Sequence, residues 1–220
     1  MNGMDNMQIV IPSVFHEYEQ MKLPDPDDYQ FYLNLGQRVF FVEGVIDRDI
    51  ESGYSSVAQL IKRIISINMD DYGKPVDERK PIVVVIDSPG GDLSLSFSLS
   101  DVIKKSVTPV YTVCLGDALS GGFLIFISGA KRFVFPHSQL LCHQGSVGVE
   151  GDVSTVQSMM NNHKRVLLSM KNYILENTSI DEKTFNSHKR SDWWISAEDA
   201  VEKYGIADAI INDLNDIIKL

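Results

Sequence analysis

Ser120 is the residue of this sequence whose type and setting best fit catalysis. It lies in a short stretch, residues 116–122 (GDALSGG), between an apolar run at 107–115 and a second one at 123–128. The first run predicts a strand and the second a short helix. A serine at such a turn exposes its hydroxyl, and the first amides of the helix favour negative charge beside it. The position also suits a serine that only caps the helix, which is the commoner role of a lone serine.

Two further polar residues stand at the ends of apolar segments. His143 ends the apolar strand predicted within residues 140–145 (LLCHQG), and Asp192 stands directly before a tryptophan pair, Trp193 and Trp194. A serine, a histidine and a carboxylate are the residue types of a nucleophile, a general base and the acid that orients the base. The three residues together therefore favour a catalytic role for Ser120 over simple capping.

A second turn could stabilise the negative charge that such a nucleophile creates. Residues 87–91 (DSPGG) follow the β-branched run 82–86, which is too apolar to have a solvated face and predicts a buried central strand that stops at Asp87. Two glycines after a proline leave backbone N–H groups unobstructed, which suits a carbonyl oxygen that becomes an anion. The turn is a candidate oxyanion hole.

The elements that must position these residues alternate along the chain. Residues 38–45 predict a first core strand, and apolar residues recur at helical spacing over 52–68 and 93–105. The order strand, helix, strand then repeats from residue 107 through the short helix at 123–128 to a strand at 132–135. This order predicts an α/β fold of stacked ββα units over a layered sheet.

Two of the predicted helices have unusual compositions. The helix at 93–105 carries Ser94, Ser96, Ser98 and Ser100, which indicate either close packing against a neighbouring element or only a face of small residues, and we favour the second interpretation. The helix at about 153–177 carries a methionine-bearing apolar stripe. A helix that projects from a domain of this size can bury such a stripe only against another subunit, so we expect oligomerisation through it.

Composition limits the class of protein. The 220 residues are 44% hydrophobic and 23% charged, which is typical of a globular domain, and no apolar run reaches the length of a membrane span. The formal net charge of −10 disfavours nucleic acids and anionic membranes as partners and leaves unfolded polypeptides open. The first 28 residues are acidic and proline-containing, and are either a mobile tail or a functional arm.

The remaining reactive side chains indicate a reducing compartment and no cofactor. Cys114 and Cys142 lie inside apolar strands, so we expect buried free thiols rather than a disulfide. The N-terminus lacks the basic start and apolar core of a secretory signal, and we expect a cytoplasmic protein. His143, His163 and His188 lack the spacing of metal ligands, and no metal or cofactor is expected.

Four segments in order resemble the ClpP family, the proteolytic subunit of the ATP-dependent Clp protease, a branch of the crotonase-like fold. They are IDSPGGD at 86–92, ALSGGFLIFISGAKR at 118–132, FPHSQLLCHQ at 135–144 and SDWWISAEDAVEKYGIAD at 191–208. The resemblance implies a serine peptidase with Ser120 as nucleophile, His143 as base and Asp192 as orienting carboxylate. It also implies that Gly91 and Gly121 supply the oxyanion amides.

The resemblance carries expectations for architecture and partners. It implies an N-terminal arm at 1–28 that acts as an axial gate, a peptidase domain at 29–220 and a projecting handle helix at about 153–177. It implies a homo-oligomer of seven subunits per ring, with two stacked rings, that degrades unfolded polypeptides and works with an AAA+ unfoldase or a sister subunit.

Departures from the family pattern leave alternatives open. The family usually has a methionine where this chain has Gly121, and aromatic residues where it has Val83 and Val85 on the strand that helps to form the unfoldase pocket. One alternative is a non-catalytic ring subunit, and another is a phage or maturation-type relative of the same peptidase. A crotonase-like acyl-CoA enzyme is disfavoured, because that chemistry does not need the serine, histidine and aspartate together.

Overall fold

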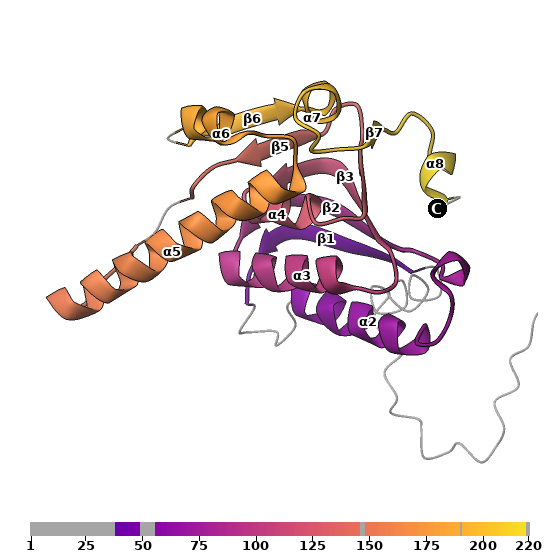
Figure 1. Cartoon of the computed structure of the whole chain (residues 1–220), viewed down its shortest axis with the longest axis horizontal. Coiled ribbons are helices and arrows are strands. Elements are labelled where there is room, and N and C mark those ends of the chain that lie inside the picture. The colour runs from indigo at the N-terminus through magenta and orange to yellow at the C-terminus, as the bar shows by residue number, and fades with distance from the viewer. Residues whose placement is uncertain (1–37, 49–55, 146–147, 190, 219–220) are drawn as a thin grey trace, which may run out of the picture. The chain divides into compact units, whose positions relative to one another are not determined.

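The computed structural model describes residues 38–48, 56–145, 148–189 and 191–218 (Figure 1). The predicted arm at 1–28 and the first residues of the predicted peptidase domain, 29–37, lie outside the described residues. Within the described part, seven strands form one sheet, and helices accompany it. The predicted α/β class, with stacked units and a projecting helix, is confirmed.

The sheet branches at its third strand. Strands β1, β2, β3, β4 and β7 pair side by side and parallel, while β5 pairs with the second half of β3 and carries β6 antiparallel on its other edge. The strands are β1 (Val39–Ile46), β2 (Ile82–Gly91), β3 (Val110–Leu119), β4 (Lys131–Val134), β5 (Gln139–Cys142), β6 (Trp193–Ser196) and β7 (Ala209–Ile210).

The helices are α2 (Ser56–Asp70), the 3₁₀ turn η2 (Val76–Glu78), α3 (Leu93–Lys105), α4 (Gly121–Phe126), α5 (Val153–Asn177), α6 (Glu182–His188), α7 (Ala197–Glu202) and α8 (Asn215–Ile218). Helices α2 and α3 pack on one another and lie together on one side of the sheet (Figure 1). Helix α4 is buried along its whole length and packs on β2 and β3, which explains why its sequence has no polar face.

Strands β2 and β3 are longer than their apolar runs. The sequence predicts that the strand at 82–86 stops at Asp87, but pairing resumes after a bulge, with Gly91 opposite Ile46 of β1 and Ser88 opposite Ala118 of β3. The prediction was wrong because a register shift lets Pro89 and the two glycines continue the strand without a regular ladder. Residues 88–91 are consequently held between the neighbouring strands β1 and β3.

Helix α5 projects from the rest of the fold (Figure 1). It covers the residues for which the sequence predicts a long helix, and only Met170 and Ile174 in its C-terminal part are buried. Met159 and Leu168 are exposed. The described residues thus leave much of the apolar side chain area of α5 uncovered.

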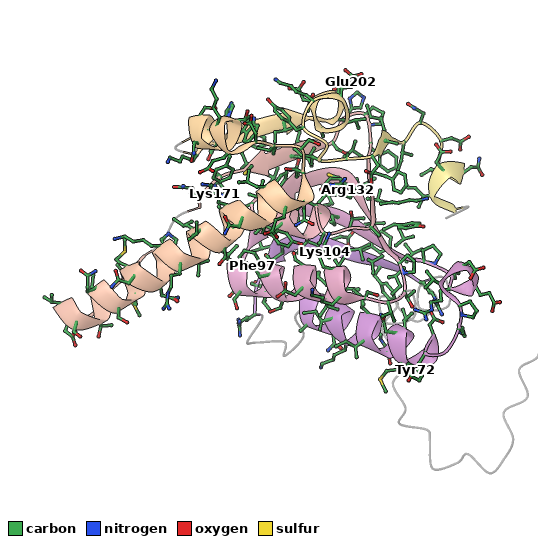
Figure 2. All side chains as sticks on the ribbon, in the orientation of Figure 1. Tyr72, Phe97, Lys104, Arg132, Lys171 and Glu202 are labelled. Carbon is green, nitrogen blue, oxygen red and sulfur yellow. The ribbon has the colours of Figure 1, made fainter. Side chains whose placement is uncertain are left out.

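The base of α5 is fixed from two sides. Phe97 of α3 meets the Tyr173 ring edge to face, with 5.9 Å between the ring centroids. Arg132 of β4 donates a 2.6 Å hydrogen bond to the Asn177 carbonyl at the end of the helix and also pairs with Asp208. Figure 2 shows Phe97 and Arg132 in the region where α5 meets the sheet and helix layers. These contacts set the direction in which the free part of the helix points.

A buried carboxylate connects the beginning of the sheet to the end of α2. Asp71 accepts two hydrogen bonds from Arg38, at 2.6 and 2.9 Å, and one each from Lys74 (2.7 Å) and the Thr108 hydroxyl (2.9 Å). The Arg38 guanidinium holds the pKa of Asp71 far below its usual range. The segments before β1 and β3 are therefore joined through one side chain.

We expect Asp71→Ala to lower the free energy of unfolding by about 3 kcal/mol, because it leaves Arg38 and Thr108 without their buried partner. Since the folded-state pKa of Asp71 is depressed, its carboxylate stabilises the fold fully above the unfolded pKa of about 4, and this contribution is lost as the pH falls below that value. Urea unfolding at pH 7 and pH 3.5 measures both effects. The matched control is Asp77→Ala at an exposed carboxylate; equal losses in the two variants would contradict the assignment.

Candidate active site

Ser120 does not act as a conventional helix cap. It precedes α4, but its side chain makes no capping hydrogen bond, and its backbone has φ 53° and ψ −114°. Arg38 and Ser120 are the non-glycine residues with positive φ in the part of the chain that the structure describes. Such a conformation costs of order 1–3 kcal/mol and is typical of functional turns. The Ser120 amide donates to the Leu141 carbonyl at 3.0 Å, which fixes the turn on β5.

The Ser120 hydroxyl is hydrogen-bonded to a histidine instead. Its Oγ lies 2.8 Å from His143 Nε2. The sheet produces this proximity, because β3 and β5 are parallel, with Leu119 opposite Leu141, so the residues that follow both strands emerge at the same edge. The spacing is that of a nucleophile and its general base.

The other nitrogen of the histidine faces the predicted carboxylate. His143 Nδ1 lies 3.3 Å from Asp192 Oδ1. Strands β5 and β6 are antiparallel, with Cys142 opposite Trp193, so the residue after β5 and the residue before β6 are neighbours. The Asp192 side chain is 63% exposed and that of His143 28% exposed. The structure thus brings together the three residues that the sequence singled out.

The segment 87–91, which carries Gly90 and Gly91, lies against the turn at Ser120. A Cβ on Gly90, which has φ +90°, would stand 2.5 Å from the Leu119 carbonyl oxygen and 2.8 Å from Gly121 N. A Cβ on Gly121 would stand 3.6 Å from Gly91 N. The Gly91 and Gly121 backbones are therefore close together, and the Cβ built on Gly90 would also stand 2.8 Å from Ser120 Cβ.

Neither cysteine offers an alternative nucleophile, although Cys142 directly precedes His143. Both cysteines are free and buried. Burial raises the pKa of each thiol to about 12, so the reactive thiolate is scarce at neutral pH. The predicted free, buried thiols are confirmed.

His188 lies near the site and has a packing role. His188 stacks on Trp193, with ring centroids 4.1 Å apart and planes at 13°, and so supports the strand that begins beside Asp192. Among the described residues, no group of three His, Cys, Asp or Glu side chains is placed to hold a metal ion. No helix in the described ranges is long and apolar enough to span a membrane.

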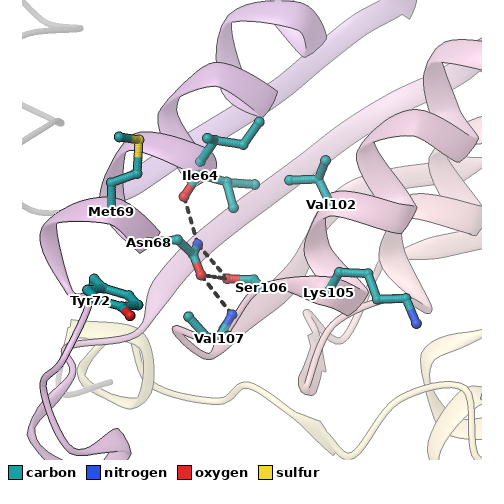
Figure 3. A pocket seen from close by; sticks show the side chains of 9 residues that line it. Ile64, Asn68, Met69, Tyr72, Val102, Lys105, Ser106 and Val107 are labelled. Carbon is teal, nitrogen blue, oxygen red and sulfur yellow. Dashed lines mark hydrogen bonds between the residues drawn. The ribbon is translucent and has the colours of Figure 1, made fainter.

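An apolar groove of about 580 Å³ lies elsewhere, between the C-terminal ends of α2 and α3. Asn68 organises it by donating to the Ile64 carbonyl and the Ser106 hydroxyl and accepting from the Val107 amide (Figure 3). Met69 and Tyr72 at its rim are exposed. None of its lining residues belongs to the Ser120 site.

The sequence model of the Clp protease family matches residues 45–213, which is most of the chain. The chain belongs to the Clp protease family. It is 33% identical over 187 residues to the ATP-dependent Clp protease proteolytic subunit 1 of Chlamydia abortus, covering 82% of this chain and 89% of that protein. It is 26% identical over 201 residues to proteolytic subunit 2 of Treponema denticola, covering 90% and 94%. The family identified from four sequence segments is confirmed.

We expect neither thiol of this Clp family member to react with Ellman's reagent at pH 7.5 while the chain is folded, because both side chains are inaccessible and protonated. Both thiols should react at once in 6 M guanidinium chloride. The measurement is the absorbance of released thionitrobenzoate before and after unfolding. Rapid release of one equivalent from the folded protein, at the same rate in Cys114→Ser, would show that Cys142 is accessible and would reopen it as a nucleophile.

Proposed function

We propose that this chain is a serine endopeptidase, a proteolytic subunit that hydrolyses unfolded polypeptides or short peptides. Ser120 is the nucleophile, His143 the general base and Asp192 the carboxylate that orients the base. The observation that carries the proposal is the 2.8 Å contact between Ser120 Oγ and His143 Nε2 at a serine with positive φ. A structural serine needs neither the strained backbone nor the histidine.

The geometry supports acyl transfer. His143 Nε2 takes the hydroxyl proton as Ser120 Oγ bonds to the peptide carbonyl carbon, and the carbonyl oxygen becomes an anion that the Gly91 and Gly121 amides stabilise. The protonated imidazole then gives its proton to the leaving amine as the C–N bond breaks. Water repeats the sequence on the acyl-enzyme and releases the new carboxylate. Asp192 accepts a hydrogen bond from the Nδ1–H group, which holds the imidazole in the tautomer that leaves Nε2 free to act as the base.

Assembly is the second part of the proposal. We propose a homo-oligomer of heptameric rings, two of them stacked, in which the exposed stripe of α5 packs against another subunit. The relatives' names describe them as subunits of an ATP-dependent protease, so we further propose an AAA+ unfoldase or a sister subunit as partner. The free thiols favour a cytoplasmic location.

The proposed nucleophile is tested by labelling with a fluorophosphonate probe. We expect one adduct per chain, formed when Ser120 Oγ bonds to phosphorus and fluoride leaves, and no adduct in Ser120→Ala. Peptide hydrolysis by that variant should fall by about a thousandfold or more, because only the oxyanion hole and substrate binding remain. Intact mass and initial rates on a fluorogenic peptide measure the two effects.

Ser98→Ala, at an exposed serine of α3, is the matched control and should label and hydrolyse like the wild type. If correctly folded wild-type rings, identified by native mass spectrometry, take up no probe and cleave no peptide, the serine peptidase proposal is wrong and a non-catalytic ring subunit is the better assignment.

The role of α5 is tested on its apolar stripe. We expect Met159→Glu/Met160→Glu to reduce the largest assembly seen by native mass spectrometry to smaller species, because it places two charges where a partner would bury apolar surface. Ser158→Glu, on the opposite face of the helix, should leave the assembly intact. Unchanged assembly of the double variant would contradict a contact through this stripe.

A further inference from the structure

Ser96 of α3 lies closer to Gly121 than a larger residue at position 121 would allow. A Cβ built on Gly121 would stand 2.3 Å from Ser96 Oγ and 3.2 Å from Ser96 Cβ. Ser96 is fully buried. It is one of the four serines for which the sequence left open close packing against a neighbour, although a face of small residues was the favoured interpretation.

The backbone does not require glycine at position 121. Unlike Gly90 and Gly91, Gly121 is absent from the positive-φ residues of the described chain, and it lies in α4, where alanine is a better helix former than glycine. The obstacle to a side chain is therefore Ser96 itself. The two residues form a matched pair, in which the hydroxyl of one occupies the space of the missing Cβ of the other.

The Ser96 hydroxyl is also fixed on the opposite side. Its Oγ donates a 2.9 Å hydrogen bond to the Asp92 carbonyl, and its amide donates to the same oxygen at 3.0 Å. Asp92 in turn donates its own amide to the Ile46 carbonyl at 2.6 Å and caps α3 through its side chain. Asp92 directly follows Gly91, so Ser96 stands between the chain at Gly91 and the chain at Gly121.

We propose that Ser96 is a positioning residue that sets the separation of the Gly91 and Gly121 amides in the oxyanion hole. This inference rests on the proposed peptidase function. Ser96 does not touch the substrate. It acts as a spacer, because its hydroxyl is held by the Asp92 carbonyl and packs on the Gly121 Cα. Displacement of Gly121 would move an amide that must meet the anion at hydrogen-bonding distance, while substrate binding would be little affected.

A double-mutant cycle with graded steps tests the pair. The variants are Gly121→Ala, Ser96→Ala, Ser96→Gly, and Gly121→Ala combined with each change at Ser96. The readouts are kcat and KM on a fluorogenic peptide, the inhibition constant of a peptide aldehyde that forms a tetrahedral adduct, and the melting temperature. Ser98→Gly is the matched control, since exposed Ser98 makes the same kind of bond, 2.8 Å to the Ser94 carbonyl, on the same helix.

We expect Gly121→Ala alone to lower kcat by about a hundredfold, the usual effect of losing one oxyanion donor, with KM nearly unchanged. Aldehyde inhibition should weaken in parallel. Adding Ser96→Ala should restore part of kcat, because it removes the Oγ atom that lies 2.3 Å from the new Cβ and leaves the Cβ of residue 96 at 3.2 Å. Adding Ser96→Gly should restore more, to at least tenfold above Gly121→Ala. Ser98→Gly should neither lower kcat nor rescue Gly121→Ala.

The outcomes separate this inference from the function on which it rests. In one outcome, the wild type reacts with fluorophosphonate, and the fold effects of the Ser96 and Gly121 substitutions on kcat simply multiply in the double variants. The positioning role is then wrong and the peptidase function stands. If the two substitutions are coupled in their effects on the melting temperature but not in their effects on kcat, the contact serves only packing and the positioning role is again wrong. An unlabelled, inactive wild type would overturn the peptidase function, and the positioning role with it.

Discussion

The close approach of two backbone turns is the constraint on which the rest of this fold depends. Gly90 lies where a Cβ would stand 2.5 Å from the Leu119 carbonyl oxygen, so no other residue can occupy the position without moving the serine turn. That contact requires β2 and β3 to continue past their apolar runs through bulges. It also holds the Gly91 and Gly121 backbones close together, and the proposed oxyanion hole would need such preorganised amides.

The branching of the sheet explains how distant residues reach this point. The first half of β3 pairs with β4 and its second half with β5, so β5 leaves the plane of the other strands and ends beside Ser120. The antiparallel pairing of β6 then places Asp192 behind His143. Each pair is set by strand register, and a slip of one residue would turn the side chains to the opposite face.

The sequence indicated the fold class and the residues that meet at the candidate site, but not the full extent of the strands. Ser120, His143 and Asp192 could be found because each stands at an end of an apolar run and within a family segment. The continuation of β2 to Gly91 could not be found, because Pro89 and two glycines normally end a strand and only pairing with both neighbours overrides that preference. Ser96 and Asp71 were missed because their partners, Gly121 and Arg38, are far away in sequence and leave no local pattern.

The position of α5 in the chain connects assembly with chemistry. His143 precedes α5 and Asp192 follows it after α6, so the proposed base and its proposed orienting carboxylate lie on the two segments that leave the ends of one projecting helix. The carboxylate is 63% exposed and holds the base at 3.3 Å, a long and solvent-screened contact. A partner that fixes α5 would restrict both segments together, and exclusion of water from Asp192 would strengthen its hold on the imidazole. The exposed part of α5 and the loosely held His143–Asp192 contact therefore lie on connected segments, so packing of the proposed partner against α5 would act on both.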